Sequence, residues 1–384
     1  MSTAYLTTGW EPDAVAPHSL RRSAMTTLET APAVHAADAL VERLFGAVLA
    51  TMDLHAVYLG DRLGYYRALA AGPLTSAELA ARTGTAERYA REWLEQQAVT
   101  GILDTDPEAD AGDRRYTLPA AYVAPLTDVL DLGHVAPFAR ATIGFVKQVD
   151  HLLEAFRTGG GVSWAQLGAD AREGQAAANR PLFLGPLGRE YLPSIPDVDA
   201  ALRAGGRVAD VGCGLGWSSI GIALAYPDVT VDGYDVDAPS IEAARHNARE
   251  AGVDDRVRFH TVDAGAVTSE AYDAVFAFEC IHDLPDPVGV LAAMRRLAGD
   301  GGAVVVMDER VAETFTAPGD DVERLMYGYS LMCCLADGMA HQPSAGTGTV
   351  MRPSTLRRYA VEAGFADVEI LDIANDFFRF YRLR

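Results

Sequence analysis

The chain has very little lysine and an excess of acid. Lys147 is its only lysine, and 53 acidic residues outnumber 32 lysines and arginines, so that the formal net charge is −21. A protein that binds a phosphate backbone or an anionic membrane needs clustered cations. Because the sequence has no such cluster, we expect no nucleic-acid partner, and solubility is a sufficient reason for the acidity.

Cysteines and long hydrophobic runs are also scarce. The four cysteines include two neighbours, Cys333 and Cys334, and their spacing suggests neither a disulfide framework nor a four-cysteine zinc site. We therefore expect no metal site. No window approaches the roughly 18 consecutive apolar residues of a membrane-spanning helix, and the first residues lack a charged-then-apolar signal pattern. These absences predict a cytoplasmic protein without a membrane segment.

The amino-terminal part is predicted to be helical. Residues 1–36 contain prolines and no apolar period, which predicts a flexible extension. Between residues 37 and 70, apolar residues from Val41 through Leu63 recur at helical spacing. Such a wide apolar stripe must be buried, either against the same domain or against a second subunit.

Residues 74–118 have the pattern of a winged helix. Thr75 or Ser76 can cap a first helix, Gly84 interrupts the pattern, Thr85 can cap a second helix, and an acidic turn leads to a short strand. Residues 75–103 hold three arginines and four glutamates, whereas a DNA-reading helix needs the opposite balance. We therefore expect residues 37–125 to form a winged-helix domain used for dimerisation.

The remainder changes from short helices to alternating strands and helices. Residues 126–204 predict a helical linker that forms one wall of a pocket. Residues 205–384 alternate between apolar strands and helices, which predicts an α/β fold with a Rossmann-like, doubly wound parallel sheet. Ligands bind such sheets at the carboxyl ends of the strands. An insertion at residues 310–351, with Met326, Tyr329 and Met332, is expected to form helical core or a lid over an apolar substrate.

The turn from Asp210 to Gly216 indicates the class of ligand. Its glycines follow the pattern G-x-G-x-G, and the position where a nicotinamide fingerprint needs a small third residue is Trp217. No Walker lysine follows the turn. The turn therefore suits a cofactor whose polar part is an amino acid rather than a pyrophosphate.

The run D-V-G-C-G-L-G resembles the first motif of class I S-adenosylmethionine-dependent methyltransferases, and the resemblance extends over about residues 205–384. It implies that Asp235 binds the ribose, that Asp263 contacts the adenine, and that Phe278 lines the methyl-donor pocket. The tail resembles the closing antiparallel hairpin of that fold. Asp210 has a second interpretation, bracing of the loop, and Asp237 is expected to be solvated. The resemblance implies these residues for binding S-adenosylmethionine: Asp210, Gly212, Gly214, Gly216, Asp235, Val236, Asp263, Ala264 and Phe278.

With the winged helix included, the chain from about residue 38 resembles dimeric bacterial small-molecule methyltransferases related to the winged-helix O-methyltransferases. This resemblance implies a homodimer that methylates a small molecule of secondary metabolism. In that group a histidine before an Asp-Trp-x-x-Asp-like sequence acts as the base, and His282 stands at the matching position, with Leu284 in place of the tryptophan. Glu279 and Glu309 follow strand ends and are competing candidate bases. Methyl transfer can also proceed by proximity alone.

Two other functions remain open at this level. The chain could be a winged-helix transcriptional regulator that senses S-adenosylmethionine, although its acidity argues against DNA binding. It could also be an enzyme of this fold that cyclises or cleaves the cofactor without methylating an acceptor.

Overall fold

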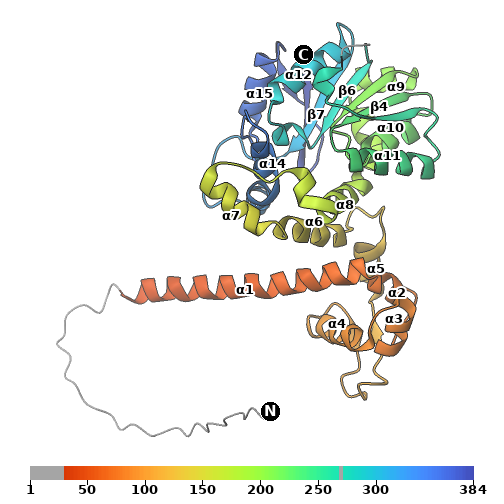
Figure 1. Ribbon diagram of the computed structural model, residues 1–384, viewed down its shortest axis with the longest axis vertical. Helices are drawn as coiled ribbons and strands as arrows, with labels where there is room; N and C mark the ends of the chain where they lie inside the picture. Colours follow the sequence, from red (N-terminus) through yellow and green to blue (C-terminus); the bar gives the residue numbers. More distant parts are fainter. Residues whose placement is uncertain (1–29, 268–270) are drawn as a thin grey trace, which may run out of the picture. The chain divides into compact units, whose positions relative to one another are not determined.

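The computed structural model describes residues 30–267 and 271–384 (Figure 1). Its contacts divide the chain after Met52, and we describe the two units separately. Most of the extension predicted at residues 1–36 lies outside the described residues, and helix α1 (Thr30–Arg62) begins inside that range. Within the described residues no helix has both the length and the apolar character needed to cross a membrane.

The first unit is described only as the beginning of α1. Its predicted apolar stripe is present and is exposed within this unit. Phe45 is 63% exposed and Met52 is 59% exposed, and the other exposed members of the stripe are Leu40, Val41, Leu44, Val48 and Leu49. Within the described residues of this unit, nothing covers these side chains.

The second unit begins with the winged helix. Its elements are α2 (Tyr65–Ala70), α3 (Ser76–Thr83), α4 (Glu87–Val99), β1 (Asp104–Thr105) and β2 (Tyr116–Thr117), and the two strands pair antiparallel. Of the two predicted cap candidates, Thr75 caps α3, and it forms a capping box with Glu78. The predicted cap at Thr85 is wrong, because α4 begins after Ala86 and the Thr85 hydroxyl accepts a hydrogen bond from Tyr65.

The arginines of the winged helix are bound to groups of the same domain. On α4, Arg88 pairs with Glu92 and Arg91 pairs with Glu87, each one helical turn away. Arg82 of α3 donates to the Ala68 carbonyl.

A set of helices connects the winged helix to the sheet: α5 (Ala120–Thr127), α6 (Ala136–Val146), α7 (Val149–Thr158), α8 (Trp164–Leu184), η1 (Leu187–Tyr191), η2 (Leu192–Ser194) and α9 (Pro196–Arg203). Helices α6 and α8 pack closely because glycines lie where they meet. A Cβ on Gly144 would lie 2.4 Å from the Ala171 nitrogen, and one on Gly174 would lie 2.4 Å from the Ala141 nitrogen. This contact fixes α8, which contributes side chains to the site described below.

The carboxyl-terminal part contains the predicted α/β sheet, and this prediction is confirmed. Seven strands have the order β5-β4-β3-β6-β7-β9-β8. The first five in sequence are parallel, and β9 pairs antiparallel with β7 and β8, as the predicted closing hairpin requires. The strands are β3 (Arg207–Val211), β4 (Thr230–Asp235), β5 (Val257–Thr261), β6 (Ala274–Phe278), β7 (Ala303–Glu309), β8 (Val368–Ile370) and β9 (Phe378–Leu383).

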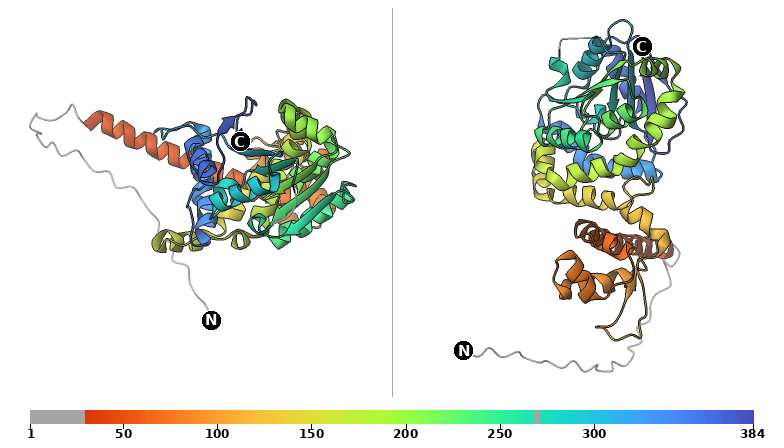
Figure 2. Two further views of the ribbon diagram at one scale, coloured as in Figure 1. Left: turned by 90° about the horizontal axis from the view of Figure 1, so that it is seen from above. Right: turned by 90° about the vertical axis from the view of Figure 1, so that its right-hand side faces the viewer.

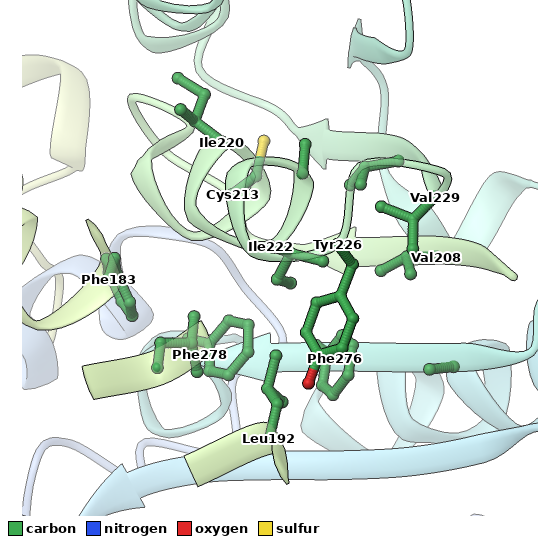
Figure 3. Packing of buried hydrophobic residues seen from close by; sticks show 14 of the residues in the cluster. Phe183, Leu192, Val208, Cys213, Ile220, Ile222, Tyr226, Val229, Phe276 and Phe278 are labelled. Atoms are coloured by element: carbon green, nitrogen blue, oxygen red, sulfur yellow. The ribbon is translucent and has the colours of Figure 1, made fainter. Parts of the chain in front are cut away.

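Helices cover both faces of this sheet (Figure 1; Figure 2). Neighbouring strand residues point to opposite faces, so Val208 packs with α9, α10 (Trp217–Ala225) and α11 (Ala238–Glu250), and Ala209 packs with α12 (Pro287–Ala298) and α15 (Pro353–Glu362). Figure 3 shows residues of the first of these cores, which include Val208 of β3 together with Ile220 and Ile222 of α10. The central strands β3, β6 and β7 are therefore buried on both faces, as their continuous apolar runs predict.

Short helices and the insertion complete the fold around the carboxyl ends of the strands. These elements are η3 (Ala264–Ala266), η4 (Ile281–Asp283), α13 (Asp321–Tyr329), η5 (Ser330–Cys334) and α14 (Leu335–Ala340). In the insertion, Met326 is buried, whereas Tyr329 and Met332 are partly buried.

Candidate active site

The glycine turn after β3 lies at the topological switch point of the sheet, since β3 lies between β4 and β6. Two of its glycines are required by sterics. Gly212 has a φ of +72°, and a Cβ there would lie 2.7 Å from the Cys280 sulfur; Gly216 has a φ of +81°, and its Cβ would lie 2.5 Å from the Phe259 ring. The turn therefore brings bare backbone to the ligand side of the sheet.

Asp210 braces this turn. Its Oδ2 accepts hydrogen bonds from the Ser218 hydroxyl at 2.6 Å and the Ser219 hydroxyl at 2.5 Å, both in the first turn of α10. Burial raises the pKa of Asp210 to about 6. Neither Asp210 nor Gly216 lines the cavity described below. The geometry thus favours the bracing interpretation of Asp210.

Asp235 ends β4 beside the glycine turn. Its two carboxylate oxygens accept backbone hydrogen bonds from Gly214 at 2.9 Å and from Asp237 at 2.8 Å. Burial raises the pKa of Asp235 even though these N–H donors oppose that rise. Each oxygen keeps a lone pair, so the carboxylate can still accept two hydroxyl donors from a ligand.

Asp237 follows in the next loop, and the expectation that it is solvated is wrong. Its side chain caps α11 and accepts two hydrogen bonds from Arg172 of α8, at 2.6 and 3.1 Å. Burial raises the pKa of Asp237, but the Arg172 guanidinium outweighs burial and holds it below its usual value. This pair ties α8 to the end of β4.

A single cavity of about 1080 Å³ joins the predicted residues. It is lined by every predicted cofactor and catalytic residue except Asp210 and Gly216, namely Gly212, Gly214, Asp235, Val236, Asp263, Ala264, Phe278, Glu279, His282 and Glu309. Val236 is 72% exposed, Asp263 is exposed at the turn that begins η3, and Phe278 packs against Phe183 of α8. Residues from the ends of five strands, β3 to β7, thus share one ligand site.

Glu279, directly after β6, has an unusual backbone and an incompletely bonded side chain. Its φ is +54°, the only positive φ at a non-glycine residue among the described residues. Oε2 accepts hydrogen bonds from Asn179 at 2.9 Å and Gln175 at 3.3 Å, and the buried Oε1 has no hydrogen-bond partner in the part of the chain that the structure describes. Burial raises the pKa of Glu279 to about 8. Backbone strain of this kind gathers at functional sites, and a carboxyl group with this pKa can exchange a proton near neutral pH.

His282 of η4 is enclosed by three carboxyl groups. Nδ1 lies 2.7 Å from Asp308 Oδ1 and 2.9 Å from Glu309 Oε2, while Nε2 lies 3.0 Å from Asp283 Oδ1. The Nδ1 hydrogen bond goes to Asp308, since Glu309 Oε2 has no hydrogen-bond partner among the described residues. Burial alone would lower the pKa of His282, but the three carboxyl groups raise it well above 6.5. A protonated imidazole cannot accept a proton.

The remaining cavity wall comes from α8 and the inserted helices, and of its residues the sequence predicted a role only for Tyr329, as helical core or part of a lid. Helix α8 contributes Gln175 and Asn179, and the inserted helices contribute the side chains of Tyr329, Cys333, Cys334 and Asp337. Tyr329 packs edge to face on Phe145, with ring centroids 6.0 Å apart. Trp164 also lines this wall. The wall is therefore aromatic, with thiol, amide and carboxyl groups set into it.

Family models match two parts of the chain. A model described as a methyltransferase domain matches residues 202–339, and one described as an Rv2258c-like winged HTH domain matches residues 50–128. Two curated relatives match part of the chain. The 27-O-demethylrifamycin SV methyltransferase of Amycolatopsis mediterranei is 33% identical over 150 residues, which are 38% of this chain and 55% of that protein. The ubiquinone biosynthesis O-methyltransferase of Burkholderia pseudomallei is 30% identical over 176 residues, which are 44% of this chain and 68% of that protein.

Solved structures match over nearly the entire chain. The mitomycin 7-O-methyltransferase MmcR has a TM-score of 0.66 at 21% identity, and the match covers 92% of this chain and 99% of that one. Human N-acetylserotonin methyltransferase has a TM-score of 0.65 at 17% identity, with 90% and 97% covered. At these identities the likeness shows a shared fold. The chain spans 55% and 42% of the lengths of the first two curated relatives.

Proposed function

The chain belongs to the S-adenosylmethionine-dependent methyltransferase family, as its sequence predicted, and from this premise we propose that it methylates a small-molecule acceptor of secondary metabolism. The observation that carries this proposal is the cavity, in which the glycine turn and the candidate proton acceptors share one space with an aromatic wall. Its volume, about 1080 Å³, is at the upper end of the range for small-molecule sites.

The residues at the carboxyl ends of β3, β4 and β5 fit S-adenosylmethionine. When bound, this cofactor supplies an electrophilic methyl group on a sulfonium. Asp235 would accept hydrogen bonds from the ribose hydroxyls, and the bare backbone at Gly212 and Gly214 leaves room for the amino-acid part. Asp263 and Ala264 would lie at the adenine. Asp210 would act by holding the turn in place.

We propose Glu279 as the residue that accepts a proton from the acceptor. It lines the cavity directly after Phe278, and its Oε1 is buried without a hydrogen-bond donor. Asn179 and Gln175 hold the other oxygen, so the carboxyl group is oriented before a ligand arrives. His282 is less suited to this role, because its neighbours keep it protonated. Glu309 also lines the cavity, where it lies against His282 Nδ1.

Two comparisons support an acceptor from secondary metabolism. One relative is named for a demethylrifamycin acceptor and one solved structure for mitomycin. The aromatic wall of Phe145, Trp164 and Tyr329 suits an apolar acceptor of this kind.

The proposal is tested with S-adenosylmethionine that carries a deuterated methyl group. The enzyme is incubated with this cofactor and a panel of hydroxylated polyketides, naphthoates and quinones, and the masses of the products are measured by mass spectrometry. We expect at least one acceptor to gain the labelled methyl group. Glu279→Gln should lower this transfer while binding of S-adenosylhomocysteine stays unchanged. Failure of the wild type to bind S-adenosylhomocysteine would exclude the proposal.

We also propose that the protein is a homodimer and that its winged helix serves assembly rather than DNA binding. The exposed apolar side chains of α1, Phe45 among them, support a second subunit as the partner of this stripe. The internal pairing of Arg88 and Arg91 supports the absence of a DNA-reading role. The bacterial source and the cytoplasmic location stay predictions.

A further inference from the structure

Three potential metal ligands of different types converge on the acceptor side of the cavity. They are His282 and Asp283 of η4 and Cys334 of η5. The ligand atoms, one from each side chain, all lie within 4.8 Å of one another. All three residues line the cavity. Cysteine spacing alone could not indicate this site, because the inserted helices bring Cys334 to η4 only in the folded chain.

The imidazole of His282 is oriented in the way that metal-binding histidines are. Its Nδ1–H donates to Asp308 Oδ1 at 2.7 Å, and this carboxylate is buried. Metal-ligating histidines commonly donate their second ring nitrogen to a carboxylate, which fixes the ring and its tautomer. The bond to Asp308 therefore leaves Nε2 as the nitrogen available for a ligand.

Nε2 and the Asp283 carboxylate lie at ion-pair distance from each other. Nε2 lies 3.0 Å from Asp283 Oδ1, yet this oxygen is buried and has no hydrogen-bond partner in the described residues. Two ligands of one tetrahedral zinc ion, each about 2.0 Å from it, lie about 3.3 Å apart. The separation is thus close to that of two ligands of a common ion, and an ion here would take the place of the proton on Nε2.

We propose that His282 Nε2, the Asp283 carboxylate and Cys334 Sγ bind a zinc-type divalent ion. Mixed nitrogen, oxygen and sulfur ligands suit zinc. On binding, the ion would displace the proton that the carboxyl groups hold on the imidazole. The neutral imidazole, the carboxylate and the thiolate would then balance the two positive charges, which favours binding in this partly buried place. Three protein ligands leave a fourth position open to the cavity, as in catalytic zinc sites.

The open position gives the ion a role that rests on the proposed methyl transfer. A hydroxyl or thiol of the acceptor would fill this position, and the ion would lower its pKa and orient it. Glu279, three residues before His282, would then take the proton that is released. The ion is not needed for cofactor binding, because the residues predicted to hold the cofactor, apart from Phe278, lie at other strand ends.

A second group of ligands shares His282 but is less suited to a metal. His282, Asp308 and Glu309 also have ligand atoms within 4.8 Å of one another. All three are buried, and Asp308 does not line the cavity. An ion there would use Nδ1, displace the bond to Asp308, and have less room for an acceptor.

The test uses the full chain, stripped with a chelator and titrated with Co²⁺ alone under reducing conditions. We expect one equivalent to bind and to produce a thiolate-to-cobalt charge-transfer band in the near ultraviolet. Cys334→Ser should remove this band, while its neighbour control Cys333→Ser and the cavity control Cys280→Ser should keep it. Zn²⁺ should displace the Co²⁺. Asp308→Asn should weaken Zn²⁺ binding by about 10- to 100-fold, the usual effect of losing a partner of a metal-binding histidine.

The outcomes separate this inference from the proposed function. Absence of a charge-transfer band in the wild type overturns the metal site. This result comes from the wild-type protein alone, so it does not depend on whether any variant folds. Metal binding that survives Cys334→Ser but is lost in Glu309→Gln also overturns it, in favour of the second group. Binding of S-adenosylhomocysteine, measured on the same samples by calorimetry, reports on the proposed function alone. Circular dichroism of each variant verifies that loss of the charge-transfer band is not caused by unfolding.

Discussion

Replacement of Asp235 by asparagine is expected to weaken binding of S-adenosylhomocysteine without unfolding the protein. The carboxylate already accepts two backbone hydrogen bonds, from Gly214 at 2.9 Å and Asp237 at 2.8 Å. Asparagine keeps one carbonyl oxygen and replaces the other by an amide nitrogen, which cannot accept. Its amide group therefore has too few acceptor sites for both N–H groups and two ribose hydroxyls.

The size of the effect follows from the bonds that are lost. A hydrogen bond to a charged group contributes about 1.5–3 kcal/mol, and about 1.4 kcal/mol corresponds to a tenfold change in affinity. Loss of one such bond to the ribose should therefore raise the dissociation constant of S-adenosylhomocysteine by about 10- to 100-fold. Isothermal titration calorimetry measures this change directly.

Asp232→Asn is the matched control for this experiment. Asp232 lies on the same strand, but it bonds to His260 and Tyr272 and does not line the cavity. This variant should bind S-adenosylhomocysteine as the wild type does. An unchanged affinity in folded Asp235→Asn protein would refute the reasoning, as would binding of a nicotinamide dinucleotide by the wild type.

Four other predictions concern catalysis, assembly and stability. Because the pKa of Glu279 is about 8, the wild-type kcat/KM should fall as the pH decreases below that value. Glu279→Gln should lose this pH dependence, and its rate should be lower by about 10²- to 10⁴-fold. A wild-type rate that does not change between about pH 6 and pH 9 would exclude Glu279 as the base. Phe45→Asp places a charge in the exposed stripe of α1 and should shift the protein from dimer to monomer in sedimentation velocity, whereas a wild type that sediments as a monomer would defeat the dimer. Deletion of residues 1–24 should change neither assembly nor activity, and deletion of residues 1–66 should give aggregated or monomeric protein in the same assay. Thr75→Ala removes the cap of α3 and should lower the free energy of unfolding by about 1 kcal/mol in urea denaturation; an unchanged midpoint would contradict the role of the capping box.

The sequence predicted those parts of the structure that are determined by residues close together in the chain. The glycine turn and Asp235 could be found because strand ends meet at one edge of a parallel sheet, and a residue at a strand end is recognisable from the strand itself. The cap at Thr75 follows from four adjacent residues. The cap at Thr85 failed because a tertiary contact, the hydroxyl of Tyr65, occupies its side chain.

The parts that the sequence missed depend on contacts between distant segments. From the sequence, Asp237 was predicted to be a solvated loop residue, because its hydrogen bond from Arg172 of α8 forms only in the folded chain. Asn179, which orients Glu279, lies in a helical region with no motif. Cys334 joins His282 only because the insertion folds over the carboxyl ends of the strands. Hydrophobic periodicity in the sequence cannot predict such contacts, since each of them depends on how separate segments pack together.

The measurement that most directly tests the central claim is the identity of the co-product formed from S-adenosylmethionine during turnover with an accepted substrate. Methyl transfer releases one S-adenosylhomocysteine for each methylated product, and chromatography with mass spectrometry quantifies both. The account predicts equal amounts of the two, with the labelled methyl group on the acceptor. Formation of methylthioadenosine with no methylated acceptor would contradict it, because the chain would then cleave or cyclise its cofactor instead of transferring the methyl group.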